Sequence, residues 1–133
     1  MAKRIIDVCG ALIEHEGKVL VAQRKYADRF GGLWEFPGGK IEDGESKETA
    51  MRRELDEELG IDVEVGKLAL VTEDEIPDLK IIFHLFQCTI KKGEPRPIDC
   101  QDVKWVTLEE SKDYLYPSLY KVLKRLEPKL QFI

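Results

Sequence analysis

Three glutamates near the middle of the sequence have the spacing of a metal-binding surface on a helix. Glu54, Glu57 and Glu58 lie at positions i, i+3 and i+4. Because a helix advances by about 100° per residue, the three carboxylates would share one face. Carboxylate oxygens are ligands that hard divalent cations such as Mg²⁺ prefer. An isolated glutamate pair is usually only a solvated surface, so a metal site needs support from the surrounding residues.

That support comes from the glycine-rich segment just before the predicted helix. Gly38 and Gly39 allow the backbone to approach a ligand closely. Glu45 lies at the start of the helix, and together these residues offer carboxylates, carbonyls and room for water, which are the ligands of Mg²⁺. Arg53 immediately precedes the glutamates. A surface arginine is common, but beside three carboxylates we predict a bidentate pair that holds one of them in place.

The helix that would position the glutamates is predicted over residues 46–59. Ser46 is a suitable N-cap, and Gly60 is suited to the left-handed conformation that often ends a helix. An apolar stripe lies about a quarter turn from the glutamates and consists of Met51, Leu55 and Leu59. One side of the helix can therefore pack against a sheet while the acidic side faces a cleft.

The rest of the sequence contains several predicted strands and a second helix. The strands are expected at residues 5–13, 18–23, 61–71, 80–90 and 103–106, with a short extended piece at 34–36. The first two are expected to form a hairpin around residues 15–17. Residues 73–79 are expected to form a turn and residues 91–99 a polar loop. A last helix is predicted from about Pro117, so the pattern indicates an α+β domain or a layered α/β/α arrangement.

Length, charge and cysteine content limit the class of protein. A chain of 133 residues favours one domain, residues 1–133. The net charge of −5 argues against stable nucleic-acid binding, which lysines and arginines drive. Cys9, Cys88 and Cys100 form no CxxC pair and are expected to be reduced thiols in a cytoplasmic protein. We find no signal peptide, and no apolar stretch approaches the roughly 20 residues that span a membrane.

The glycine-to-helix segment resembles the complete Nudix box. The fixed positions of this signature are Gly39, Glu45, Arg53-Glu54-Leu55, Glu57-Glu58 and Gly60-Ile61. The segment 32–42 (Gly-Leu-Trp-Glu-Phe-Pro-Gly-Gly-Lys-Ile-Glu) also resembles the MutT-like branch of that family. The resemblance implies the Nudix fold, an α/β/α sandwich around a mixed sheet. It also implies Mg²⁺-dependent hydrolysis of a nucleoside triphosphate to a monophosphate and pyrophosphate, as in nucleotide pool sanitation of the 8-oxo-dGTP or CTP type.

The resemblance assigns metal-binding and catalytic roles to individual residues. Glu54, Glu57 and Glu58 would bind Mg²⁺, or Mn²⁺ in its place, together with the Gly38 carbonyl. Arg53 would orient the glutamates. Glu45 would support the helix and its neighbouring charges. Asp99, six positions before Trp105, occupies the place of a family glutamate that binds metal or activates water, although its side chain is shorter and it could be an ordinary loop residue.

Four further residues are expected near the substrate. They are Arg24 for the substrate, Lys40 for the phosphates, and Phe36 and Tyr116 for the base. Arg24 matches a family arginine that contacts substrate, with a surface arginine at a strand end as the alternative. Phe36 and Tyr116 are equally suited to an apolar core, as is Phe83, a further candidate for the base pocket.

Several alternatives remain open in the sequence. The general base is one of the three glutamates or Asp99. Tyr116 stands where related sequences often carry Asn or Asp to read a base edge, and Leu79 stands where a basic residue is expected, so the preferred base is undetermined. Other hypotheses are a hydrolase of a dinucleoside polyphosphate or nucleotide sugar, a non-catalytic nucleotide sensor, and a structural domain. The expected partner is a small nucleotide, and the chain is expected to be a monomer or weak homodimer.

Overall fold

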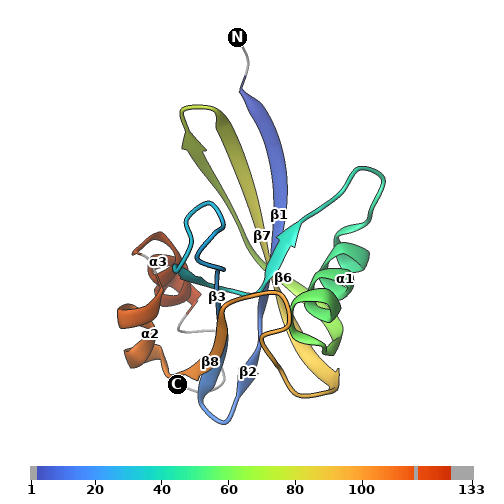
Figure 1. The fold of residues 1–133 in the computed structure, drawn as a ribbon, viewed down its shortest axis with the longest axis vertical. Helices are drawn as coiled ribbons and strands as arrows, with labels where there is room; N and C mark the ends of the chain where they lie inside the picture. The colour runs from blue at the N-terminus through green and yellow to red at the C-terminus, as the bar shows by residue number, and fades with distance from the viewer. Residues whose placement is uncertain (1–2, 116, 127–133) are drawn as a thin grey trace.

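Helices lie on both sides of the β-structure, which gives the domain three layers. The computed structural model describes residues 3–115 and 117–126. Helix α1 (Lys47–Leu59) covers one side, and α2 (Leu108–Tyr114) and α3 (Pro117–Leu126) lie on the other (Figure 1). This arrangement confirms the predicted α+β sandwich.

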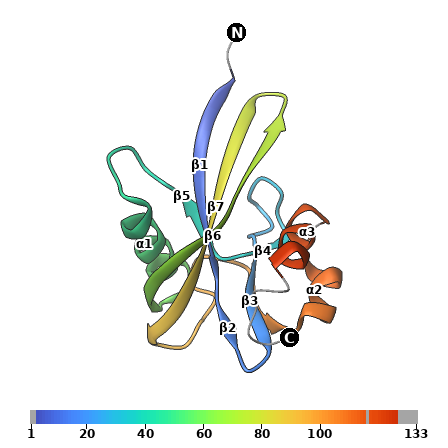
Figure 2. The same ribbon diagram turned by 180° about the vertical axis from the view of Figure 1, so that it is seen from behind.

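The larger sheet carries the glycine-rich segment at one edge. Its strand order is β5 (Gly38–Lys40), β1 (Arg4–Leu12), β7 (Leu79–Lys92) and β6 (Asp62–Ile76). β1 runs parallel to β7, whereas the β1–β5 and β6–β7 pairs are antiparallel, so the sheet is mixed as predicted. Beyond the helices, β1, β6 and β7 continue together as a projecting arm (Figure 2).

The smaller sheet is built around one buried strand. β3 (Lys18–Gln23) pairs with β2 (Glu14–His15), with β4 (Trp34–Glu35) and with β8 (Asp102–Val106). The loop between β3 and β4 leaves this sheet beside the glycine-rich segment. The smaller sheet therefore places that loop close to the predicted site.

Helix α1 forms as the sequence predicts, because both of its ends are capped and one face is apolar. The Ser46 hydroxyl accepts a hydrogen bond from the Thr49 N–H at 3.1 Å, and Gly60 adopts a φ of 69°. The apolar stripe packs fully against the larger sheet, with Met51, Leu55 and Leu59 all 0% exposed. Burying this stripe turns the acidic face away from the core.

Two predictions about the strands are correct only in part. The expected hairpin forms close to its turn, where Glu14-His15 pairs with β3, but β1 pairs with β5 and β7 inside the larger sheet. β6 and β7 also run on to Ile76 and from Leu79, so the predicted turn over residues 73–79 shrinks to Pro77-Asp78. Pairing between strands so distant in the sequence depends on tertiary contacts, and local patterns carry little information about it.

One helix of the described residues was absent from the prediction. α2 begins with a capping box, in which the Thr107 hydroxyl accepts from the Glu110 N–H and the Glu110 carboxylate accepts from the Thr107 N–H. The Thr-x-x-Glu spacing that produces this box is visible in the sequence. α3 confirms the predicted final helix, which begins at Pro117.

All three cysteines are free thiols, and burial raises the pKa of Cys9 to about 11 and that of Cys88 to about 12. Throughout residues 3–115 and 117–126, no helix is both long and apolar enough to cross a membrane.

Candidate active site

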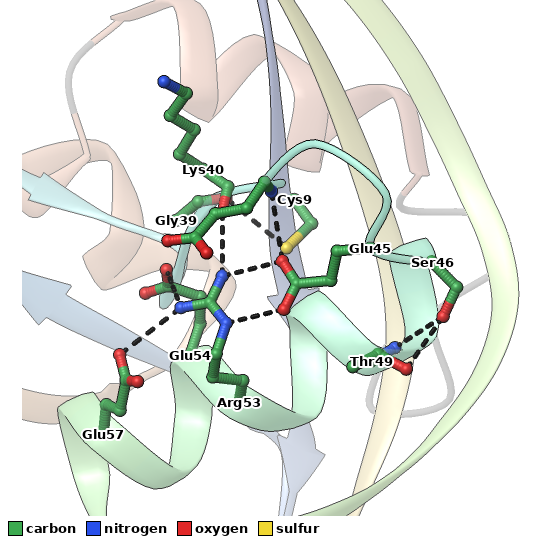
Figure 3. Close-up of polar contacts among 10 residues, drawn as sticks. Cys9, Gly39, Lys40, Glu45, Ser46, Thr49, Arg53, Glu54 and Glu57 are labelled. Carbon is green, nitrogen blue, oxygen red and sulfur yellow. Dashed lines mark hydrogen bonds and ion pairs between the residues drawn. The ribbon is translucent and has the colours of Figure 1, made fainter.

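Arg53 joins the helix to the glycine-rich segment through five contacts. Its Nε and Nη2 atoms donate to the two oxygens of Glu45, at 2.7 and 2.9 Å, as a bidentate pair (Figure 3). Its Nη1 atom lies 2.9 Å from an oxygen of Glu54 and 3.4 Å from one of Glu57. Nη2 also donates to the Lys40 carbonyl at 3.1 Å. The predicted bidentate pair therefore exists, but its partner is Glu45, outside the three clustered glutamates.

The Glu45 carboxylate is held in its ionised form by this pairing. The Arg53 guanidinium and then the backbone N–H of Glu42 lower the pKa of Glu45 to about 2. In turn, Glu45 raises the pKa of Arg53. The pair fixes the guanidinium that contacts Glu54 and Glu57, so Glu45 acts as a positioning residue for the acidic face.

Replacing Glu45 with Gln is expected to lower stability in a pH-dependent way. Because the folded-state pKa of about 2 lies below the ordinary value of 4.5, the carboxylate stabilises the fold fully above pH 4.5. That contribution is lost as the pH falls through 2. Urea unfolding of the wild type and Glu45→Gln from pH 7 to pH 2 should show a stability difference that shrinks below pH 4.5. A difference independent of pH would contradict the assignment.

Both glycines of β5 lie so close to other atoms that neither position has room for a Cβ atom unless its neighbours move. A Cβ atom on Gly39 would lie 2.4 Å from a carboxylate oxygen of Glu54, and one on Gly38 would lie 2.0 Å from the Cys9 carbonyl oxygen. The Gly38 N–H also hydrogen-bonds to the Glu58 carboxylate. The glycine-rich segment and the helix therefore meet directly at Glu54 and Glu58.

Glu58 faces a small polar cavity between the helix and two loops. The cavity has a volume of about 90 Å³ and is lined in part by Arg24, Glu35, Gly38, Glu58 and Asp99. Burial, followed by the charges of Glu35, Glu54 and Asp99, raises the pKa of Glu58 to about 9. The cavity can hold several waters or a hydrated ion.

Asp99 reaches this cavity because its loop docks on the C-terminal end of α1. The N–H groups of Ile98 and Asp99 each donate to the Glu58 carbonyl at 3.1 Å, and the Arg96 N–H donates to the Leu59 carbonyl at 3.0 Å. These bonds satisfy carbonyls that a helix end leaves without intrahelical partners. The same bonds bring Asp99 to the cavity that Glu58 also lines.

The carboxylates of Glu54, Glu57 and Glu58 do not gather around one point in the side-chain conformations of this structure. Within the described ranges, no three His, Cys, Asp or Glu side chains are grouped closely enough to hold a metal ion. Glu54 and Glu57 instead contact Arg53, whereas Glu58 lines the cavity. The donors still fit a divalent cation, because Glu58 is a partly buried oxygen ligand close to other carboxylates.

The residues predicted to bind substrate have different surroundings. Arg24 lines the cavity and pairs with Glu35 at 3.1 Å. The Lys40 side chain is exposed and points away from Arg53 (Figure 3). Phe36 is 3% exposed and packs in the core, which favours the core interpretation over contact with a base. Tyr116 lies outside the described residues.

Three charged residues of the cavity were missed in the sequence. Lys25, Asp28 and Glu35 line the cavity together with the predicted residues. Burial raises the pKa of Glu35, and Arg24 opposes this effect. The sequence signal for Lys25 was its position next to Arg24 at the end of a predicted strand. Two neighbouring basic residues at a strand end can both contact the same ligand.

Comparison with known proteins gives consistent matches over nearly the whole chain. The pattern of the NUDIX domain matches residues 3–126. The CTP pyrophosphohydrolase of Escherichia coli (strain K12) is 38% identical over 111 residues, which are 84% of this chain and 82% of that protein. The 8-oxo-dGTP diphosphatase of Proteus vulgaris is 40% identical over 92 residues, 69% of this chain and 82% of that protein.

Solved structures show the same architecture. The crystal structure of the MutT protein from Methanosarcina mazei Go1 superposes with a TM-score of 0.87 at 26% identity and covers 97% of both chains. The solution structure of the Escherichia coli ORF135 protein superposes with a TM-score of 0.79 at 34% identity, over 97% of this chain and 95% of that one. The likeness therefore extends over both sheets and over α1.

Proposed function

The chain belongs to the NUDIX domain family and is a hydrolase of that family, and from this premise we propose that it hydrolyses a nucleoside triphosphate to a nucleoside monophosphate and pyrophosphate. NUDIX hydrolases act on small nucleotide substrates and generally need divalent metal ions. We propose Mg²⁺ as the metal, with Mn²⁺ as a substitute. The relatives named for hydrolysis of CTP and of 8-oxo-dGTP support a nucleoside triphosphate as the substrate.

The observation that carries this proposal is the position of the Glu58 carboxyl group among other acidic side chains. This group is held by the Gly38 N–H in a polar cavity, and Glu35, Glu54 and Asp99 add negative charge around it. A carboxylate in such surroundings is stabilised by a cation, and Mg²⁺ prefers oxygen ligands. Arg24 and Lys25 on the same cavity add positive charge suited to phosphate oxygens.

In this mechanism, Glu54, Glu57 and Glu58 would hold the metal with the Gly38 carbonyl. A bound divalent cation supplies positive charge that polarises a phosphoryl oxygen and lowers the pKa of a coordinated water. Arg53 keeps Glu54 and Glu57 beside the glycine-rich segment, and Arg24 would bind and orient the polyphosphate at the cavity. One carboxylate, Asp99 or a glutamate of the cluster, would take the proton from the attacking water.

A substrate panel tests this proposal. The purified protein would be incubated with Mg²⁺ and with CTP, dCTP, GTP, dGTP, 8-oxo-dGTP, a dinucleoside polyphosphate and a nucleotide sugar. Pyrophosphate and the nucleotide products would be measured. We expect pyrophosphate from a triphosphate of the CTP or oxidised-guanine type, and no turnover in excess chelator until Mg²⁺ is restored. Turnover of the dinucleoside polyphosphate or nucleotide sugar alone would replace the proposed substrate class with that alternative.

A further inference from the structure

Lys25 bridges the two loops that border the cavity. Its ammonium lies 2.5 Å from a carboxylate oxygen of Asp99. Lys25 belongs to the loop between β3 and β4, whereas Asp99 is fixed to the end of α1 by its N–H bond to the Glu58 carbonyl. Both residues line the cavity that contains Glu58. The ion pair therefore joins the two loops on the lining of that cavity.

The backbone of the Lys25 loop is held in place, while the lysine side chain can turn. The Arg24 N–H donates to the Leu33 carbonyl at 2.9 Å and the Gly32 N–H donates to the Arg24 carbonyl at 3.0 Å, which closes the loop at its base. Arg29 of this loop also contacts Asp78, in the turn between β6 and β7, at 3.3 Å. Lysine carries its charge on a flexible four-carbon stem, and the Lys25 side chain is 47% exposed. The ammonium can therefore exchange partners without movement of the loop.

The charges around the cavity make such an exchange favourable when ligands bind. Arg24 is engaged by Glu35, and Lys25 is engaged by Asp99. A divalent cation at Glu58 would attract the neighbouring Asp99 carboxylate and compete with the ammonium for it. A polyphosphate bound to that cation would offer the released ammonium a charge-assisted hydrogen bond.

We propose that Lys25 neutralises Asp99 in the metal-free protein and transfers to a phosphate oxygen when the divalent cation and the nucleotide occupy the cavity. The inference rests on the proposed function and names a further substrate-binding residue for it. Lys25 thus has opposite effects on the two ligands: it competes with the metal and assists the nucleotide. This opposition separates the proposal from a purely structural ion pair.

Binding measurements on Lys25→Met test the two effects separately. Mn²⁺ alone would be titrated by electron paramagnetic resonance, and a non-hydrolysable triphosphate analogue would be titrated calorimetrically with Mg²⁺ present. We expect Lys25→Met to bind Mn²⁺ several-fold more tightly and the analogue roughly tenfold more weakly. Lys25→Arg should retain most of the analogue affinity. The control Lys3→Met, which removes an exposed pair to Glu75 at 2.9 Å, should change neither affinity.

The outcomes distinguish this inference from the proposed function. If Lys25→Met leaves both affinities unchanged, or weakens both together, Lys25 does not exchange partners and the inference is overturned. In that case the wild type would still hydrolyse its triphosphate with Mg²⁺. A wild type without hydrolysis of any triphosphate in the panel would instead remove the proposed function on which the inference rests.

Discussion

Replacing Glu57 with Gln is expected to lower kcat on the order of a hundredfold or more, because a bound metal stabilises transition-state charge by several kcal/mol and about 1.4 kcal/mol corresponds to a tenfold change in rate. The fold should survive. The Glu57 side chain is 57% exposed and makes a single 3.4 Å contact with Arg53. Exposed i,i+4 ion pairs contribute only about 0.3–0.5 kcal/mol to stability.

The matched control for this substitution is Asp56→Asn. Asp56 is an exposed carboxylate on the same helix, and its substitution removes the same charge one residue away from the proposed metal-binding face. Steady-state kinetics at saturating Mg²⁺ and thermal melts would be recorded for both variants. Equal activities of Glu57→Gln and the wild type would count against a metal role for Glu57.

A methyl group on Gly39 is expected to abolish most of the activity at a small cost in stability. In Gly39→Ala the new Cβ would lie 2.4 Å from one Glu54 carboxylate oxygen and 2.7 Å from the other, so this carboxylate must move. The obstructed atoms are the end of a flexible side chain, and they can rotate away without moving the backbone. Loss of the Glu54 position should reduce kcat by about a hundredfold, as for loss of a metal ligand.

Gly17→Ala serves as a control, because this substitution should lower stability without lowering activity. Gly17 lies in the turn between β2 and β3 with a φ of 79°, a conformation that strains any residue with a Cβ. We expect Gly17→Ala to lose about 1 kcal/mol of stability while kcat is retained. Chemical denaturation and kinetics on both variants would separate the two effects. A Gly39→Ala protein with full activity would show that Glu54 does not depend on this contact.

Local signals predicted the helix but not the order of the strands. Ser46, Gly60 and the stripe formed by Met51, Leu55 and Leu59 define α1 through interactions within a few residues of one another. The pairing of β1 with β7 depends on residues far apart in the chain, and the local pattern instead favoured a hairpin with β3. The α2 capping box was a local signal that the prediction overlooked.

Most residues of the candidate site could be predicted from the sequence, whereas the contacts between them could be predicted only in part. The signature placed Glu54, Glu57, Glu58 and Arg53 on one helix, and the structure agrees with that placement. The sequence did not show that Arg53 forms its bidentate pair with Glu45, because that contact depends on how the turn before α1 folds back. The Lys25–Asp99 pair joins two loops distant in the sequence, so it emerges only once both loops are placed.

Equilibrium binding of Mn²⁺ to the protein without nucleotide tests most directly whether the acidic face of α1 holds divalent cations. The wild type would be compared with the triple variant Glu54→Gln, Glu57→Gln, Glu58→Gln, and circular dichroism would verify that both are folded. We predict binding by the wild type and at least a hundredfold weaker binding by the triple variant, as expected for removal of charged oxygen ligands. Equal Mn²⁺ affinity in the two folded proteins would contradict a metal site on this helix.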